Sequence, residues 1–482
     1  MVLQRDAPAV LWGFADAGVI VNVTLGGGAS FAGTTGADGV WRVTLPPAPA
    51  TPAGTDTGED LAFACSDGGG FTLVDVLRGD VLLASGQSNM CFTVSQAFNA
   101  SEEVAASAGY PRLRVMTAAH VTAAAPALDL GGYVQPWARA SPATIGGGNF
   151  SFTSAVGYFS ARDLYDALAG GVPVGLAVAC VSGTALAQWS SPAALAMCPS
   201  VPVPNGAQPS ELWNGMLHPF TVGPLALTAL LFYQGESDAD NYAWYACSFP
   251  SFITDARRAL GRGTSLPFAF VLLSAWVKSG TGNLDHLPRT RLAQLAALAL
   301  PNTSVAAAYD LGDVSSPWPG HPRAKQPVGA RLTAGLLAGA AYRRAVPATG
   351  PTYAASAAAA APAGTLAVRI DFAPGSAAGG LALRVAPACP AGVPRDMCEA
   401  FALQTDDGAW TEAQAALTAD GIALLLTISG VRAGLAVNAS RGLFANWPLA
   451  QLWGGAGFPA LPWLEPLGAR AGGRAAEGEK EN

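Results

Sequence analysis

The sequence predicts an α/β protein, with one parallel-sheet domain flanked on both sides by β-rich regions. Between about residues 79 and 346, short apolar runs alternate with segments of helical period, which is typical of strand–helix units. Before and after this stretch, apolar and polar residues alternate with a period of two, which is typical of half-buried antiparallel strands. A chain of 482 residues is long enough for about three domains.

Residues 1–78 are predicted to form an N-terminal β-rich domain. Val21 and Val23 alternate with polar neighbours, and Trp41 and Val43 do the same. Each alternating run is bounded by glycine or proline, which ends strands. The segment therefore indicates antiparallel strands with one buried face.

Residues 79–346 are predicted to form the α/β domain. Apolar residues at helical spacing indicate helices around 158–168 and 328–340, and residues 111–150 are expected to be an irregular insertion. The expected strands of the parallel sheet are Val81–Ala84, Val174–Cys180, Leu225–Tyr233, Pro267–Leu273 and Ser304–Asp310.

Residues 347–467 are predicted to form a C-terminal β-rich region. The alanine-rich run Ala354–Gly364 is expected to be a linker, and strand periodicity returns at Val368 and Ile370. The final residues, 468–482, are small or charged and are expected to be a disordered tail.

The charge balance argues against a nucleic-acid or anionic-membrane partner. The net charge is −7, and only 12% of the residues are charged. Alanine makes up much of the apolar fraction, and no long, strongly apolar run predicts a membrane span. No Cys or His cluster has the spacing of a zinc motif, so we expect no metal site.

Other features predict a secretory, lysosomal or extracellular protein, with the cytoplasm as second choice. Five Asn-x-Ser/Thr sequons occur, at Asn22, Asn99, Asn149, Asn302 and Asn438. Among the seven cysteines, Cys389 and Cys398 are close enough to close a short disulfide loop. Because no signal peptide is visible after Met1, this prediction requires that a leader is missing from the chain.

Residues with chemical potential follow the predicted parallel strands. Ligands bind beyond the carboxyl ends of the strands in open α/β sheets, so these residues are expected to meet at one edge. The sets that follow successive strands are Ser88 with Gln87 and Asn89, then Gly183, then Gln234 with Glu236, and finally Asp313 with His321.

Ser88 and His321 are the candidate nucleophile and base. A serine after a strand is more often a helix cap, but Gly86 precedes Ser88 by two residues, as in an exposed nucleophile turn. His321 follows the last parallel strand and is expected at the head of a helix, from which a base reaches a nucleophile on the first strand. His218 is the rival histidine.

The third strand end supplies an amide and a carboxylate. Gln234 is a candidate donor to a developing oxyanion, together with the backbone N–H groups of Ser88 and Gly183. Glu236 and Asp313 are the two candidate acids for orienting the histidine, and Glu236 alternatively binds a substrate hydroxyl. An exposed pair in a loop is the plainer interpretation of Gln234 and Glu236.

Several motifs make the chain similar to one family. The sequence resembles the sialate O-acetylesterases, within the SGNH-type (GDSL-like) carbohydrate esterases. The motifs that carry this resemblance are Gly79-Asp80, G-Q-S-N-M at Gly86–Met90, A-V-G-Y-F at Ala155–Phe159, W-N-G-M at Trp213–Met216, Y-Q-G-E-S at Tyr233–Ser237, H-P-R-A-K-Q at His321–Gln326 and N-W-P at Asn446–Pro448.

The resemblance implies an SGNH-like three-layer catalytic domain and a serine esterase that removes O-acetyl groups from sugars. It implies Ser88 as nucleophile, His321 as base, and an oxyanion site around Gly183 and Gln234. Because Trp318 stands where many such enzymes have Asp, the acid is Asp313 or Glu236. In the matching motifs, Gln87, Asn89 and Asn214 are candidate oxyanion or substrate-binding residues.

No metal or organic cofactor is expected, and the partner is an O-acetylated sugar. Sialic acid is the substrate that the family implies. Two alternatives remain open, an acetylesterase acting on xylan or another polysaccharide and a non-catalytic carbohydrate-binding protein on the same scaffold. The sequence does not decide the oligomeric state.

Overall fold

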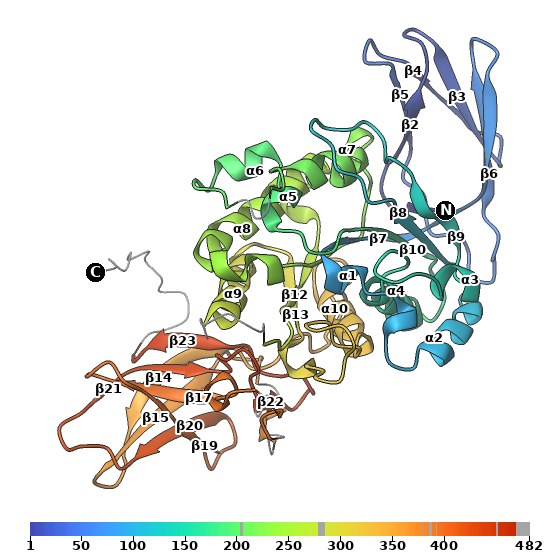
Figure 1. Ribbon diagram of the computed structural model, residues 1–482. Coiled ribbons are helices and arrows are strands. Elements are labelled where there is room, and N and C mark those ends of the chain that lie inside the picture. Colours follow the sequence, from blue (N-terminus) through green and yellow to red (C-terminus); the bar gives the residue numbers. More distant parts are fainter. Residues whose placement is uncertain are drawn as a thin grey trace. The chain divides into compact units, whose positions relative to one another are not determined.

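The computed structural model divides into two compact units (Figure 1). It describes residues 1–202, 206–277, 285–377, 379–384, 388–391, 393–449 and 452–468. The large unit comprises Met1–Leu272, Ala293–Ala306 and His321–Val346, and the second unit comprises Leu273–Leu292, Ala307–Gly320 and the chain from Pro347 on. Apart from Gly468, the expected disordered tail lies outside the described residues.

The N-terminal strands of the large unit pair mostly antiparallel, and the exception is the first strand, which pairs parallel with the last. They are β1 (Val2–Gln4), β2 (Ala9–Phe14), β3 (Ile20–Leu25), β4 (Ser30–Thr34), β5 (Val40–Leu45), β6 (Glu59–Cys65) and β7 (Gly70–Gly86). β2 pairs with β5, whereas β3 pairs with β4 and β6. The alternating residues Val21, Val23, Trp41 and Val43 are all buried in one apolar core, as the period-two pattern predicts.

Strand β7 joins this β-rich region to the catalytic sheet. Its first half pairs antiparallel with β6, and its second half pairs parallel with β10 (Val174–Cys180) and β11 (Ala229–Tyr233). The strand runs without interruption through residues 78 and 79, where the composition changes. One rigid element therefore carries the chain into the edge of the sheet where Ser88 follows.

The main sheet has the order β13-β12-β11-β7-β10-β8-β9. Its other strands are β8 (Leu113–Ala118), β9 (Tyr133–Arg139), β12 (Phe268–Leu272) and β13 (Thr303–Ala307). In the parallel register, Gly86 lies opposite both Cys180 and Tyr233. The carboxyl ends of the three central strands are therefore level, as the edge argument requires.

Helices cover both faces of this sheet. They include α1 (Ser88–Cys91), α2 (Ala100–Ala106), α3 (Pro142–Ile145), α4 (Ala155–Ala167), α5 (Leu186–Trp189), α6 (Pro192–Ala196), α7 (Pro219–Val222), α8 (Tyr242–Ala259) and α10 (Gln326–Ala338), whereas most of α9 (His286–Leu295) belongs to the second unit. Gly157 of α4 lies against Ala84, whereas Phe252 of α8 packs on Phe232. Because Phe232 pairs with Ser85, these two helices lie on opposite faces of the sheet, which gives the three layers.

The expectation of an irregular insertion over residues 111–150 is wrong in part. This segment contains β8, which pairs parallel with β10, and β9, which closes the edge antiparallel to β8. All six residues of β8 are buried. A strand buried on both faces shows no alternation, and here two arginines interrupt its apolar run on either side of Leu113.

The second unit contains two packed sheets and a smaller strand pair. The strands are β14 (Tyr353–Ala359), β15 (Thr365–Phe372), β16 (Leu381–Leu383), β17 (Phe401–Thr405), β18 (Trp410–Glu412), β19 (Gln414–Leu417), β20 (Ala423–Ser429), β21 (Val437–Gly442), β22 (Leu452–Gly454) and β23 (Trp463–Pro466). One sheet has the order β14-β15-β20-β19 and the other β18-β17-β21-β23. The Trp463 ring lies 6.0 Å from Phe372 of the first sheet and 5.9 Å from Phe401 of the second, so it sits in the core between them.

The alanine-rich run Ala354–Gly364 is not a linker, because most of it lies in strand β14. This strand pairs antiparallel with β15 over its whole length. Alanine has low strand propensity, so the sequence offers no local signal, and pairing with an apolar neighbour decides the structure. The Tyr353 hydroxyl donates to Ser356 Oγ at 2.9 Å and fastens the start of the strand.

Asp80, from the Gly79-Asp80 motif, is a buried anchor at the opposite end of the strands from Ser88. Its carboxylate accepts hydrogen bonds from the Arg5 guanidinium at 2.8 Å, the Tyr342 hydroxyl at 2.6 Å and the Thr228 hydroxyl at 3.2 Å. A cavity of about 270 Å³ lies beside these groups. The motif therefore ties the N-terminal strand, β7 and the segment after α10 together, away from the predicted reaction centre.

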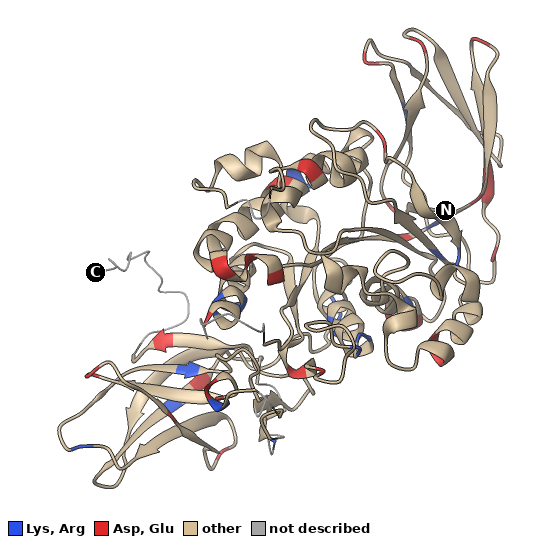
Figure 2. Ribbon diagram, viewed as in Figure 1, with Lys and Arg blue, Asp and Glu red and all other residues tan. Residues whose placement is uncertain are grey.

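Charged residues are sparse in both units. Figure 2 shows them as short, separate segments on an otherwise uncharged ribbon. In the large unit, several ion pairs join residues close in sequence, such as Arg42 with Asp38 at 3.2 Å. This distribution agrees with the low charged fraction and gives no extended basic face among the described residues.

Candidate active site

A strained turn places Ser88 at the carboxyl edge of the sheet. Gly86 ends β7 with φ +138°, and a Cβ atom there would lie 2.1 Å from the Tyr233 carbonyl oxygen. Only glycine fits this conformation and this close approach. The chain then turns directly into α1, whose first residue is Ser88.

The structure brings Ser88 and His321 together across 233 residues of sequence. His321 Nε2 lies 2.7 Å from Ser88 Oγ, within the range for direct proton transfer. The Phe150 ring stands edge-on to the imidazole at 5.1 Å and limits its movement. His321 precedes α10 by five residues and does not stand at its first turn, because the helix begins at Gln326.

The rival histidine has a different environment. His218 Nδ1 lies 2.9 Å from the Ala127 carbonyl oxygen, and the Ala127 N–H donates to the Asn214 carbonyl. These contacts hold the loop after β8 against the helical turn that contains His218. The geometry gives His218 a structural contact and gives His321 the contact with the serine.

Two backbone N–H groups at this edge are available to a ligand. Within the described part of the chain, neither the Ser88 N–H nor the Gly183 N–H donates a hydrogen bond. Gly183 is exposed, has φ +74°, and has no atom within 4 Å of the position that a Cβ would take. Free N–H donors of this kind are what an oxyanion requires.

Gln234 is buried and fully engaged. Its amide nitrogen donates to the Thr184 carbonyl at 3.0 Å and to the Asp238 carboxylate at 2.5 Å, which uses both of its hydrogens. Gln87 Oε1 accepts from the backbone N–H groups of Gly235 and Ser237 at 3.4 and 3.3 Å. The two glutamines therefore hold the loops that follow β7, β10 and β11 together.

Asn89 lies in a buried chain of polar contacts beneath the turn. Its amide donates to Glu236 Oε1 at 2.6 Å, and its carbonyl oxygen accepts from Lys325 Nζ at 2.6 Å. Lys325 is fully buried, and its ammonium group lies 4.7 Å from the Phe92 ring and 5.5 Å from the Tyr233 ring. These polar contacts connect α1, which begins with the candidate nucleophile, to the segment that carries His321.

Asp238 is a buried residue that the sequence analysis missed. It accepts the Leu186 N–H at 2.9 Å in addition to the Gln234 amide. Burial is the largest effect on this carboxyl group, and it raises its pKa to about 6 despite these hydrogen bonds. The available signal was its position two residues after Glu236, in a helical turn that follows a strand end.

Asn214 lies in a π-helical turn, η3 (Trp213–Leu217). Its amide donates to the Ala123 carbonyl at 3.1 Å. Its buried Oδ1 has no hydrogen-bond partner among the described residues. A buried carbonyl oxygen without a donor is costly, and a ligand N–H or O–H, or a water molecule, would satisfy it.

Asp313 lies in the second unit, on a loop that this unit itself organises. The carboxylate accepts the Ser315 N–H at 3.1 Å and the Ser315 hydroxyl at 2.9 Å. Just before it, the Tyr309 hydroxyl donates to the Ala460 carbonyl, and the Gly312 backbone rests on the Trp447 ring. The N-W-P motif near the C-terminus therefore supports the loop that carries this candidate acid.

Six of the seven cysteines are paired. The disulfides are Cys91–Cys180, Cys198–Cys247 and Cys389–Cys398, and Cys65 is a free thiol. The pair Cys389–Cys398 is the one that the sequence spacing indicates. The Cys91–Cys180 bond joins the end of α1 to the end of β10, close to both Ser88 and Gly183.

Comparison with known proteins decides the family. The model of the carbohydrate esterase family described as sialic acid-specific acetylesterase matches residues 78–335. The sialate O-acetylesterase of Homo sapiens is 36% identical over 368 residues, which cover 70% of this chain and 69% of the human protein. The chain belongs to this esterase family. It is accordingly a carboxylic ester hydrolase, as the motifs predict.

Two further relatives agree with this assignment. The sialate O-acetylesterase of Rattus norvegicus is 34% identical over 395 residues, covering 70% of this chain and 71% of the rat protein. A crystal structure of a carbohydrate acetylesterase from Xanthomonas citri matches with a TM-score of 0.79 at 27% identity. That match covers 96% of this chain and 97% of the other, so it confirms the SGNH-type fold with its flanking β-rich regions.

None of the described helices is both long and apolar enough to cross a membrane.

Proposed function

We propose that this carbohydrate esterase hydrolyses O-acetyl esters of sialic acids, with Ser88 as nucleophile and His321 as general base. The observation that carries the proposal is the 2.7 Å separation between His321 Nε2 and Ser88 Oγ. The substrate class rests on the family and on the named activity of the mammalian relatives.

The reaction proceeds in two steps. His321 accepts the hydroxyl proton as Ser88 Oγ attacks the acetyl carbonyl carbon, and the negative oxygen accepts hydrogen bonds from the Ser88 and Gly183 N–H groups. The C–O bond to the sugar then breaks, and the sugar oxygen leaves with the proton from His321. Water, deprotonated by His321, attacks the acetyl-enzyme and releases acetate and the free serine.

In this mechanism, three of the predicted site residues hold neighbouring groups in position and do not contact the substrate themselves. Gln234 spends both amide hydrogens on protein acceptors, so we assign it to holding the Thr184 segment beside Gly183, not to direct oxyanion contact. Gln87 fixes the turn after β11, and Asn89, which is fully buried, joins Glu236 to Lys325. Asn214 is the candidate for direct substrate contact, because its Oδ1 has no protein donor in the described residues.

Asp313 is our choice for the acid that orients His321. This choice keeps the preference drawn from the sequence, because one oxygen of each candidate is engaged elsewhere, Asp313 Oδ1 by Ser315 and Glu236 Oε1 by Asn89. We expect Asp313→Asn to lower kcat on the order of 10³- to 10⁴-fold. Glu236→Gln should cost less, because a glutamine oxygen still accepts from Asn89. The reverse ranking of the two kcat values would assign the acid to Glu236.

Replacing the nucleophile tests the mechanism. Ser88→Ala should reduce hydrolysis of 4-nitrophenyl acetate by at least about 10⁴-fold. The variant should stay folded, because it loses one hydrogen bond worth about 1 kcal/mol. Ser85→Ala is the matched control, since Ser85 is buried three residues earlier and its hydroxyl has no hydrogen-bond partner in the described residues. Full activity in Ser88→Ala would end the proposal.

Two assays separate the alternatives. A fluorophosphonate probe should label wild type and not Ser88→Ala, whereas a non-catalytic carbohydrate-binding protein would leave both unlabelled. Acetate release from O-acetylated sialic acid and from acetylated xylan, compared at equal ester concentration, distinguishes the two esterase substrates. Faster release from xylan would replace the sialate assignment and leave the serine mechanism intact.

We propose that the protein works in the secretory pathway or a compartment derived from it. Three disulfides favour an oxidising environment. All five sequon asparagines are exposed, at positions 22, 99, 149, 302 and 438. Expression through a eukaryotic secretory route should give a mass that falls after endoglycosidase treatment, and an unchanged mass would contradict glycosylation.

A further inference from the structure

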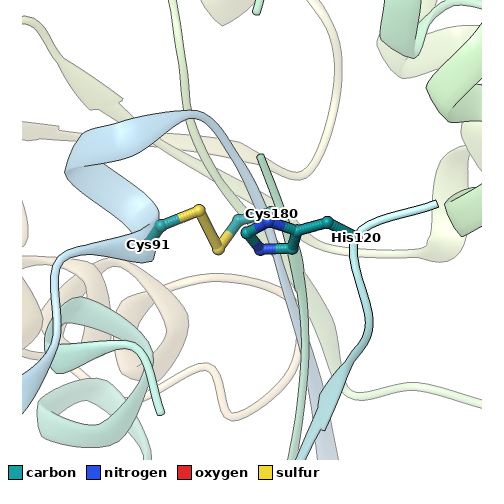
Figure 3. Close-up of side chains that lie close together, drawn as sticks. All are labelled: Cys91, His120 and Cys180. Atoms are coloured by element: carbon teal, nitrogen blue, oxygen red, sulfur yellow. A yellow bond between two sulfur atoms is a disulfide. The ribbon is translucent and has the colours of Figure 1, made fainter. Parts of the chain in front are cut away.

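A histidine lies beside the disulfide that adjoins the candidate active site. Figure 3 shows the His120 ring next to the bond between Cys91 and Cys180. The two sulfur atoms and a ring nitrogen of His120 all lie within 4.8 Å of one another. The cysteines are buried, whereas His120 is exposed and closes the cluster from the solvent side.

Each member of the cluster comes from a different element of the central sheet edge. Cys91 ends α1, Cys180 ends β10, and His120 follows the end of β8. Cys91 lies three residues after Ser88, and Cys180 lies three residues before Gly183. The disulfide therefore connects the two backbone segments that offer N–H groups to the oxyanion.

The same three side chains are of the types that bind zinc once the sulfurs are reduced. Thiolate sulfur and neutral imidazole nitrogen are the ligands that Zn²⁺ prefers, at about 2.3 and 2.1 Å from the ion. An ion at tetrahedral geometry accepts three protein ligands and keeps one position for water. A separation of 4.8 Å or less between ligand atoms needs only small side-chain movements to reach such a geometry.

Sequence spacing does not reveal this site. The ligands are separated by 29 and 60 residues, whereas zinc motifs are recognised from pairs a few residues apart. Parallel strand ends bring them together, just as they bring Ser88 to the sheet edge. The expectation of no metal site used only the spacing of cysteines and histidines along the sequence, which does not detect ligands that meet through the fold.

We propose that Cys91, Cys180 and His120 form a Zn²⁺ site when the disulfide is reduced. The ends of α1 and β10 would then stay linked whether the cysteines are oxidised or reduced. A dithiol reductant supplies two electrons and two protons, breaks the S–S bond and is itself oxidised to its disulfide. Zn²⁺ then binds both sulfurs as thiolates, with the release of two protons, and the His120 ring nitrogen completes the protein ligands.

The other disulfides provide an internal comparison. Cys198–Cys247 and Cys389–Cys398 have no third histidine or carboxylate within the same reach among the described residues. They are expected to stay two-ligand pairs when reduced, with much weaker metal binding. A double serine variant at Cys198 and Cys247 is therefore the matched control for loss of any buried disulfide.

The test uses Co²⁺ as a coloured probe and then Zn²⁺. The full-length protein is reduced with dithiothreitol, freed of reductant by gel filtration under nitrogen, and titrated with Co²⁺. Reduced wild type should bind one ion per chain with sulfur-to-cobalt charge-transfer absorption, and Zn²⁺ should displace it. The oxidised protein should show no such band.

Variants assign the ligands. Cys91→Ser with Cys180→Ser should abolish the band, and His120→Ala should weaken binding by more than about tenfold. His120→Ala keeps the disulfide, so it also serves if the double variant fails to fold. The control with Cys198→Ser and Cys247→Ser should retain the site. Absence of binding to reduced wild type, or binding unaltered by His120→Ala, would overturn the proposal.

Discussion

Gly183 offers a test of the oxyanion arrangement that leaves every side chain in place. Gly183→Ala adds a methyl group at a residue with φ +74°, where an L-residue costs about 1–2 kcal/mol. The added Cβ meets no atom within 4 Å, so the penalty is conformational and not steric. In the free variant we expect the exposed loop to relieve this strain by rotating, which would turn the N–H of residue 183 away.

In the variant, the free energy of the transition state then rises by the smaller of two penalties. Returning the loop to positive φ costs about 1–2 kcal/mol, whereas reacting without this donor costs about 2.7–4 kcal/mol. The smaller figure corresponds to a fall of roughly 5- to 30-fold in kcat/KM at 1.36 kcal/mol per decade. We therefore expect a moderate loss of activity, far from the loss in Ser88→Ala.

The assay compares kcat/KM for 4-nitrophenyl acetate in Gly183→Ala and Gly54→Ala. Gly54 has φ +80°, is exposed, and likewise has no atom near the position of a Cβ, so the backbone penalty is matched. Gly54→Ala should keep wild-type kcat/KM within twofold. If Gly183→Ala also stays within twofold, its N–H is not an oxyanion donor.

Two other perturbations test the supports of the site. Asp238 has a folded-state pKa of about 6, above its ordinary 3.8, so its contribution to stability is present below about pH 3.8 and is lost as pH rises through 6. Thermal melts should show that the stability of Asp238→Asn rises relative to that of wild type between pH 4 and 6.5. A stability difference that does not change with pH would contradict the argument that burial raises the pKa of Asp238. Trp447→Ala removes the ring under Gly312 and should lower kcat by less than Asp313→Asn does. Trp453→Ala is its control, and equal losses in both tryptophan variants would refute a specific role for Trp447.

Much of the large unit was predictable because its strands carry strong local patterns. The strand Val174–Cys180 has the predicted bounds, and the other expected strands of the sheet overlap β7, β11, β12 and β13. β8 was missed because arginines interrupt its apolar run, although the chain buries both guanidinium groups. β14 was missed because alanine gives no preference for strand, and pairing with β15 supplies it.

The candidate site was predictable where topology sufficed and not where side-chain orientation mattered. Level strand ends bring Ser88 near His321, which the edge argument anticipates. The same argument cannot tell which polar side chains point outward. Gln234 and Asn89 point inward and bind protein partners. Asp238, to which the sequence analysis gave no role, accepts hydrogen bonds in the same buried region.

Neutral amides give this edge of the sheet a particular electrostatic character. Gln87 and Gln234 satisfy backbone and carboxylate groups at the loop ends without bringing net charge beside Ser88. A buried amide costs far less to desolvate than a buried ion, and it fixes neighbours through both donors and acceptors. The loop ends are thus held in place before substrate arrives, while the Ser88 and Gly183 N–H groups keep no protein acceptor in the described structure. In the proposed mechanism, charge that develops on an acetyl oxygen meets donors whose orientation has already been set by folding, so little reorganisation is required during the reaction.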